Sequence, residues 1–302
     1  MERNKLAVIA IGGNSLISET EEVNVASEYK IVGETCRQIA QLMEDGWNVV
    51  ITHGNGPQAG WNLRRSELAS HELFELPMDV IVTFTQGSIG YYIQQNLTNI
   101  FAKSDPHRKI ATIVTQIEVD PKDKAFDNPT KSIGGYLTEE QARKMEASGW
   151  PTAEEPGKGW RRLVASPAPL RIIELEIIRD LLARDHIVVA CGGGGVAVAK
   201  SDRGHLEGVP AIIDKDLSSA LLASELNAQL LIISTAVERV ALNFGKENET
   251  WLDQISLDQA RAYQDEGHFG VGSMAPKVNA AMTFIEKGGA SVIITNPQNI
   301  YK

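Results

Sequence analysis

Three glycine-rich segments have the residue composition that phosphate binding requires. Each one directly follows a short run of apolar residues, at Gly12, Gly54 and Gly192. Glycine lets the backbone approach a phosphate closely, and a helix that begins just afterwards presents free N–H groups to it. One such turn is explained by ordinary strand-to-helix geometry. Three turns at the same edge of a parallel sheet favour a phosphate site.

Three lysines supply the positive charge that such a site needs. Lys215 lies between two aspartates in an otherwise apolar motif, and Lys277 follows Pro276, which suits the first position of a helix. Lys131 lies in a proline-rich stretch. By composition alone, each would be a solvated surface lysine, and Asp216 would be the N-cap of the helix that follows it. The flanking carboxylates make Lys215 the strongest candidate of the three.

Other kinds of chemistry receive less support from the residues. The segment 54–59 matches a dinucleotide-binding fingerprint, but no strand ending in an acidic residue follows at the required distance, so we interpret the match as accidental. No Walker A loop is present, and the six histidines show no metal-ligand spacing. We interpret His53 as structural, and Cys191 as a small apolar strand end and not as a nucleophile.

The composition restricts the class of protein. The 302 residues are 43% hydrophobic and carry a formal net charge of −10, which argues against a nucleic-acid or anionic-membrane partner. No apolar run is long enough to span a bilayer, and the charged N-terminus leads into a strand too short for a secretory signal. With only Cys36 and Cys191 present, no disulfide framework is expected, and the cytoplasm is the predicted compartment.

Apolar runs alternate with amphipathic segments along the chain, which predicts an α/β protein. We expect one domain over residues 1–302, and capping boxes at Thr138 and Ser256 that begin two helices. Prolines punctuate residues 117–169, which we interpret as an inserted, protruding lid subdomain, called the lid segment below. The predicted strands are 5–11, 47–52, 109–115, 186–191, 230–235 and 290–295, and the predicted helices include 25–45, 216–227, 256–266 and 276–288.

Several motifs together resemble those of the carbamate kinases, a group within the amino acid kinase family. The resemblance covers nearly the whole chain and rests on motif order and spacing. The motifs are Ile11-Gly12-Gly13-Asn14, Thr52-His53-Gly54-Asn55-Gly56-Pro57-Gln58, Thr85-Gln86-Gly87-Ser88-Ile89-Gly90-Tyr91, Pro129-Thr130-Lys131, Gly159-Trp160-Arg161-Arg162, Cys191-Gly192-Gly193-Gly194-Gly195, Ile213-Asp214-Lys215-Asp216, Asn243-Phe244-Gly245-Lys246 and Gly272-Ser273-Met274.

This resemblance implies an open, mainly parallel sheet between helical layers, a homodimer, ATP or ADP with Mg²⁺, and reversible phosphoryl transfer between carbamoyl phosphate and ADP, mainly toward ATP. It implies phosphoryl-binding and nucleotide-binding roles for Lys131, Lys215 and Lys277, organised by Asp216. The acyl-phosphate cradle would be formed by Gly12, Gly13, Asn14, Gly54, Asn55 and Gly56. The nucleotide pocket would include Asp214, Asn243, Phe244, Gly245, Ser273 and Met274, with no confident protein ligand to a metal.

Some positions depart from the usual carbamate kinase sequence. They are Ser132, Lys158, Ala165, Ala168, Val196, Ala197, Ala236 and Ala275. Most lie in or near the lid segment, so they leave open a related acid kinase with another small carboxylate substrate. A nucleotide-binding regulatory homologue with reduced catalysis is a further alternative, which retention of all three lysines opposes. The sequence ends at Lys302 before the final Gly-Thr strand usual in the family, so a truncated C-terminus is also left open.

Overall fold

The computed structural model describes residues 5–13, 16–17, 22–270 and 272–301. Its centre is a six-stranded sheet in the order β15-β12-β1-β2-β9-β3, in which every neighbouring pair is parallel. Its strands are β1 (Lys5–Ile11), β2 (Trp47–His53), β3 (Ile110–Thr112), β9 (Ile187–Val189), β12 (Leu230–Ser234) and β15 (Ser291–Thr295). The α/β class and the mainly parallel sheet predicted from the sequence are confirmed.

The alternation of side chains along β1 explains the three layers. Ala7, Ile9 and Ile11 point to the face that helices α1 (Val25–Glu44) and α3 (Met78–Phe101) cover. Val8 and Ala10 point to the opposite face. Successive side chains of a strand alternate between faces, so a strand buried on both sides is apolar throughout. The second layer of helices consists of α5 (Leu175–Leu182), α6 (Lys215–Glu225) and α8 (Met274–Glu286).

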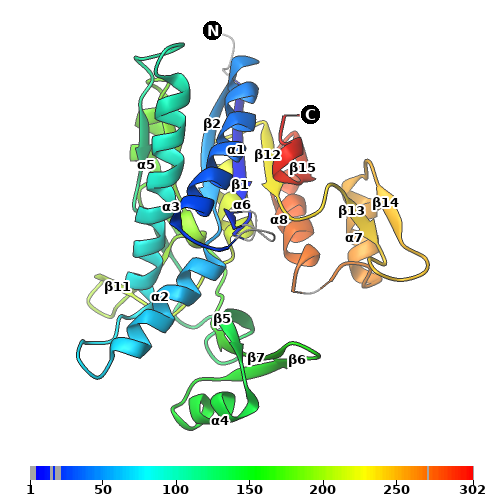
Figure 1. Ribbon diagram of the computed structural model, residues 1–302. Helices are drawn as coiled ribbons and strands as arrows, with labels where there is room; N and C mark the ends of the chain where they lie inside the picture. The colour runs from blue at the N-terminus through cyan, green and yellow to red at the C-terminus, as the bar shows by residue number, and fades with distance from the viewer. Residues whose placement is uncertain (1–4, 14–15, 18–21, 271, 302) are drawn as a thin grey trace.

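Smaller units flank this core. A four-stranded sheet has the order β11-β10-β4-β8, a hairpin pairs β13 with β14, and a three-stranded sheet has the order β5-β7-β6. Figure 1 shows the last sheet and α4 protruding together at one end of the molecule, and the hairpin with α7 projecting from its side. Their bounds are β4 (Gln116–Glu118), β5 (Lys131–Leu137), α4 (Glu139–Ala147), β6 (Thr152–Glu155), β7 (Gly159–Val164), β8 (Arg171–Ile172), β10 (Val196–Lys200), β11 (Leu206–Gly208), β13 (Val240–Leu242), β14 (Thr250–Leu252) and α7 (Leu257–Asp265).

The remaining helices are α2 (Gly56–Ala69) and the short 3₁₀ turns η2 (Gly192–Gly194) and η3 (Pro297–Asn299). Both predicted capping boxes are confirmed, at Thr138 before α4 and at Ser256 before α7. Two predicted helix starts were wrong. The N-cap of α6 is Asp214 and not Asp216. The Asp214 side chain accepts from the backbone N–H of Asp216, which satisfies a helix N–H that has no partner within the helix. Helix α8 begins at Met274, so Pro276 occupies its third position, where the helix still needs no N–H donor.

Candidate active site

The three glycine-rich turns meet at one edge of the central sheet. They follow β1, β2 and β9, which are parallel neighbours in the order β1-β2-β9, so their carboxyl ends lie side by side. The first two turns are in contact: a Cβ atom added to Gly54 would lie 2.6 Å from the backbone nitrogen of Gly13. Only glycine permits this approach. The predicted convergence of the turns is therefore observed.

A cavity of about 230 Å³ lies beside these turns and brings together most of the predicted phosphate-binding residues. Helix α2 begins within the cavity wall at Gly56, so its free N–H groups lie at the site. Asn14 lies outside the described residues. The predicted residues that line the cavity are Gly12, Gly13, Gly54, Asn55, Gly56, Lys131, Asp214, Lys215, Asp216 and Lys277.

A second cavity, of about 620 Å³, adjoins the first. Both are lined by Asp214, Asp216, Lys277, Thr235 and Ala236, so they meet at the lysine cluster. The predicted nucleotide-pocket residues Asn243, Phe244, Ser273 and Met274 line the second cavity. Gly245 is not among its lining residues; its backbone N–H binds the carboxylate of Glu249 instead.

The sequence analysis did not assign some lining residues of the second cavity to the nucleotide pocket, among them Thr235, Ala236, Arg239, Lys246 and His268. Thr235 follows the fourth strand end at this edge, that of β12. Its place at the end of the predicted strand 230–235 was the signal that could have identified it, but no glycine-rich turn marks that strand end. His268 lies within 2.9 Å of the Asn243 side chain, which connects it to the predicted pocket.

Asp216 holds two of the three lysines. Its carboxylate accepts from Lys215 Nζ at 2.6 Å and from Lys277 Nζ at 2.9 Å, while only 3% of the Asp216 side chain is exposed. Burial alone would raise the pKa of Asp216, but the two ammonium groups outweigh burial and hold this pKa at about 2. Asp216 is therefore ionised throughout the neutral range and fixes both cations at the junction of the cavities.

Lys215 is the most deeply buried of the lysines, with 11% of its side chain exposed. Its Nζ also donates to the carbonyl of Ala10, at the end of β1. Burial lowers the pKa of Lys215, because it disfavours the charged form, and the neighbouring Asp216 only partly opposes this effect. Its ammonium thus has one fixed carboxylate and one carbonyl, and its remaining hydrogen-bonding capacity is available to an anionic ligand.

Lys131 reaches the site from the first residue of β5, in the protruding sheet. Its Nζ lies 2.9 Å from a carboxylate oxygen of Asp214. The cluster of three lysines and two aspartates at the junction therefore has one positive charge in excess. This local excess stands against a chain whose formal net charge is −10. The arrangement suits a ligand that carries several negative charges.

His53 and Cys191 lie close to the turns but are not available for acid–base or nucleophilic chemistry. Burial lowers the pKa of His53 to about 4, and its Nδ1 lies 3.0 Å from the carbonyl of Gly54. Burial also raises the pKa of Cys191 far above its usual range. Neither side chain lines the two cavities. Their structural interpretation agrees with these positions.

Of the positions that depart from the usual carbamate kinase pattern, two line the first cavity. Ser132 follows Lys131 on β5, and Ala236 lies where the two cavities join. The other departures, at Lys158, Ala165, Ala168, Val196, Ala197 and Ala275, line neither cavity. Among these positions, only Ser132 and Ala236 are therefore placed to contact a ligand in the first cavity directly.

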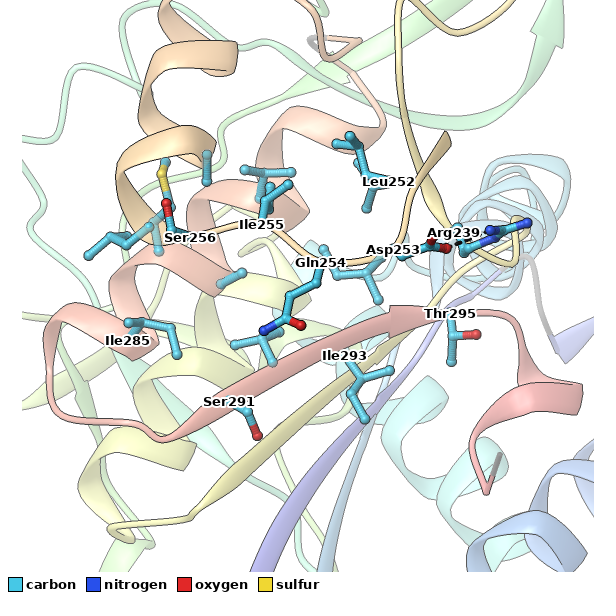
Figure 2. A pocket seen from close by; sticks show the side chains of 18 of the residues that line it. Arg239, Leu252, Asp253, Gln254, Ile255, Ser256, Ile285, Ser291, Ile293 and Thr295 are labelled. Atoms are coloured by element: carbon cyan, nitrogen blue, oxygen red, sulfur yellow. Dashed lines mark hydrogen bonds and ion pairs between the residues drawn. The ribbon is translucent and has the colours of Figure 1, made fainter. Parts of the chain in front are cut away.

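A larger cavity, of about 730 Å³, lies elsewhere, between β15, α7, α8 and the β13–β14 hairpin. Figure 2 shows Ser291, Ile293 and Thr295 along β15 on one side of it, with Arg239 and Asp253 near one end. The Arg239 guanidinium lies 2.6 Å from the Asp253 carboxylate. None of Lys131, Lys215 or Lys277 lines this cavity, so it is not the phosphate site.

The fold and the site define a class of protein: a three-layer α/β protein that gathers lysines and glycine amides around two adjoining cavities at the carboxyl edge of its sheet. A family model for the amino acid kinase family matches residues 5–296. The chain belongs to this family, and it is therefore a phosphotransferase by class.

Individual relatives align with this chain over nearly its full length. The chain is 45% identical to carbamate kinase from Pyrococcus furiosus over 295 residues, covering 97% of this chain and 94% of the relative. It is 42% identical to the carbamate kinase-like protein YahI of Escherichia coli over 299 residues, with the same coverage. The structure of Giardia lamblia carbamate kinase bound to AMP-PNP matches with a TM-score of 0.90 at 37% identity, covering 99% of this chain and 95% of that one.

Proposed function

We propose that this protein is a carbamate kinase, which transfers a phosphoryl group between carbamoyl phosphate and ADP to give carbamate and ATP. The observation that supports this best is the junction of the two cavities at Lys215, Asp216 and Lys277. The glycine-lined cavity has the size and polarity for a small acyl phosphate. The larger cavity accommodates a nucleotide whose terminal phosphate points toward the junction.

In the direction of ATP synthesis, an oxygen of the ADP β-phosphate forms a bond to phosphorus while the bond from phosphorus to the carbamate oxygen breaks. Carbamate leaves as an anion, and the attacking oxygen is already an anion, so no general base is required. Catalysis then depends on in-line positioning and on neutralising the charge spread over the phosphoryl oxygens. His53 and Cys191 are not available for acid–base or nucleophilic chemistry, which agrees with a mechanism that needs no general base.

The lysines and the cavity walls would share these tasks. Lys215 and Lys277 are fixed by one carboxylate, so both ammonium groups are in place before the substrates bind. A lysine at about 4 Å contributes roughly 4 kcal/mol per unit charge at an effective dielectric near 20, before desolvation. Holding both anions in line supplies roughly 7 to 11 kcal/mol. Positioning by the turns and by Lys131 is therefore comparable to the roughly 8 kcal/mol that two such lysines give together.

Mg²⁺ is part of the proposal, carried into the site by the nucleotide. The two carboxylates at the junction, Asp214 and Asp216, already accept from lysines. In the ranges that the structure describes, no group of three or more His, Cys, Asp or Glu side chains is placed to hold a metal ion. The site thus fits a cation held mainly by nucleotide phosphates, where it would neutralise phosphate charge, with Asp214 and Asp216 nearby.

We also propose a homodimer and a cytoplasmic location. Helix α3 exposes Phe84 and Tyr91, seven residues apart on one face, and Phe84 is 51% exposed. Large apolar side chains on one helix face are typical of a contact with a second copy. No helix within the described ranges has the length and apolar character to cross a membrane. Sedimentation velocity tests the dimer: a monomer at micromolar concentration would exclude it.

The test of function is ATP formation from ADP, Mg²⁺ and carbamoyl phosphate, with acetyl phosphate as a second donor and EDTA as a metal-removal control. We expect turnover with carbamoyl phosphate that Lys215→Ala lowers by about a hundredfold or more, because the phosphoryl oxygens would lose one of the cations fixed at the junction. Lys246→Ala, at the rim of the nucleotide cavity, should change mainly the KM for ADP.

A second candidate is an acid kinase for another small carboxylate. Ser132 and Ala236, which line the first cavity and depart from the usual pattern, favour it. Turnover with acetyl phosphate but not with carbamoyl phosphate would select this candidate. ADP binding without turnover of either donor would contradict both and point to a regulatory homologue.

A further inference from the structure

The motif Thr85 to Tyr91 contributed to the resemblance, but nothing in the proposed mechanism uses it. In the structure the whole motif lies inside α3, and the side chains of its first two residues, Thr85 and Gln86, are buried although both are polar. Neither lines the two cavities. A buried polar side chain is costly unless hydrogen bonds satisfy it, so the partners of these two residues indicate what they do.

Gln86 joins α3 to the ends of two strands. Its Oε1 accepts from the backbone N–H of Thr115 at 2.9 Å. Its Nε2 donates to the carbonyl of Thr115 at 3.1 Å and to the carbonyl of Gly192 at 2.9 Å. Both amide hydrogens and the amide oxygen are therefore used. One side chain fixes the glycine turn after β9 relative to the loop after β3.

Thr85 fixes the neighbouring wall of the cavity. Asn55 Nδ2 donates to Thr85 Oγ1 at 2.8 Å, and Thr85 Oγ1 donates to the carbonyl of Val82 at 2.7 Å. The Asn55 amide is also packed against Gly193, where an added Cβ atom would lie 2.2 Å from Asn55 Nδ2. Asn55 is thus held between Thr85 and Gly193, and both Asn55 and Gly193 line the small cavity.

The far side of the same turn contacts the helix that carries the lysine. The carbonyl of Gly194 accepts from Ser218 Oγ at 2.7 Å, and Ser218 lies in the first turn of α6, three residues after Lys215. The glycine turn is therefore held from α3 on one side and from α6 on the other. The proposed nucleotide cavity, of about 620 Å³, is lined by neither Asn55 nor any residue of this turn.

We infer that Thr85 and Gln86 are positioning residues for the acyl-phosphate side of the site: they set the places of Asn55 and Gly193, and the nucleotide side does not depend on them. The inference rests on the proposed function. A displacement of about 1 Å in such a wall is sufficient to cost two orders of magnitude in rate.

The experiment compares matched substitutions on α3. Gln86→Met removes all three bonds to Thr115 and Gly192. Gln94→Met removes a similar bond on the same helix, in which the backbone N–H of Thr112 donates to Gln94 Oε1 at 3.1 Å. We expect Gln86→Met to raise the KM for carbamoyl phosphate about tenfold or more while the KM for ADP changes less than about twofold. Gln94→Met should lower the melting temperature and leave both KM values unchanged.

A second pair keeps the test decisive if Gln86→Met does not fold. Thr85→Val removes the partner of Asn55, and its control Thr83→Val removes a side-chain bond from Thr83 to the carbonyl of Asp79, one turn earlier. The same shift in KM for carbamoyl phosphate alone is expected for Thr85→Val. The conservative variant Thr85→Ser, which keeps the acceptor, should restore the wild-type value.

Three outcomes would overturn the inference. Unchanged KM values in the α3 variants would show that the bonds do not position the cradle. A parallel rise of both KM values, in proportion to the loss of melting temperature and shared by Gln94→Met, would show a purely structural role. Absence of turnover in the wild-type protein would instead contradict the proposed function itself, and the inference with it.

Discussion

At the residue scale, the central feature is one buried carboxylate shared by two lysines. Asp216 remains ionised because Lys215 and Lys277 outweigh the cost of its burial. Removing one partner of such a group leaves an uncompensated buried charge, which costs more than the pair contributes when intact. Substitution of Asp216 would therefore confuse loss of catalysis with loss of stability, and the lysines are the better probes.

The pKa of Lys215 predicts the alkaline limit of activity. Burial lowers this pKa below that of an ordinary lysine, so the free enzyme loses the Lys215 charge at a lower pH than usual. We expect kcat/KM to fall on the alkaline side before pH 10.5, the ordinary value for lysine. Bound phosphates favour the charged form, so kcat should fall at a higher pH than kcat/KM does.

The control for this prediction is Lys215→Arg. Arginine keeps its charge over the whole range, so the variant should be less active but should lose the alkaline decline. Steady-state rates between pH 6 and pH 10.5 provide the measurement. A wild-type profile that stays flat to pH 10.5, or one that declines equally in Lys215→Arg, would assign the limit to another group.

At the element scale, the contact between α2 and β5 determines where Lys131 lies. A Cβ atom added to Gly60 would lie 2.5 Å from the Cα of Gly134, so this helix and this strand touch backbone to backbone. A second contact joins α2 to the same sheet: the guanidinium of Arg162 on β7 lies 3.0 Å from the carboxylate of Glu67 on α2 and 3.3 Å from the ring centroid of Trp150. These contacts dock the protruding sheet, while closure of the lid segment over the ligand remains a prediction.

Gly60→Ala tests this docking. Alanine favours a helix over glycine by about 1 kcal/mol, so helix propensity alone would stabilise the variant. The added methyl group must instead push β5 away and shift Lys131. We expect kcat/KM for carbamoyl phosphate to fall about tenfold or more, with ADP affinity by calorimetry unchanged.

The matched control is Gly87→Ala, at a helical glycine whose added Cβ would meet nothing within 4 Å. It should gain the helix propensity without loss of rate. Equal rates in Gly60→Ala and Gly87→Ala would mean that β5 adapts without moving Lys131.

The elements also show how far sequence reasoning could go. Long buried strands such as β1 and capping boxes such as that of Thr138 carry local signals, and they were predicted within a residue or two. The β13–β14 hairpin was missed because each of its strands has only three residues. The three-residue strand β4 was missed because its partner β10 is distant in the sequence. The same reason explains the site: the glycine turns were visible in the sequence, whereas the shared contact of Lys277 with Asp216 spans 61 residues and exists only after folding.

At the scale of the whole molecule, positive charge gathers at the candidate site although the net charge of the chain is negative. The chain is acidic overall, yet the cluster of three lysines and two aspartates at the junction of its two cavities has one positive charge in excess. The excess is confined where glycine amides and helix N-termini also favour anions. A net charge far from zero keeps a protein soluble, and the local reversal lets it still bind anionic substrates.

Buried titratable groups near the site also make the free energy of unfolding depend on pH. His53 determines the first pH range over which it changes. Its pKa is about 4 in the fold and about 6.5 in the unfolded chain, so between these values the unfolded state binds more protons. Stability is therefore complete above about pH 6.5 and is lost as pH falls toward 4. Between pH 7 and pH 5 the loss should be about 2 kcal/mol, measured by urea unfolding.

His53→Gln is the control, because glutamine cannot take up the proton and should lose much less stability over the same range. Asp216 opens a second window: its folded pKa of about 2 lies below the unfolded value of 3.8, so its contribution is present above that value and disappears as pH falls through 2. The two windows predict a decline in two steps, the first from His53 and the second from Asp216. Equal losses in wild type and His53→Gln between pH 7 and pH 5 would show that the pKa of His53 is not lowered in the fold, and that another group causes the loss of stability.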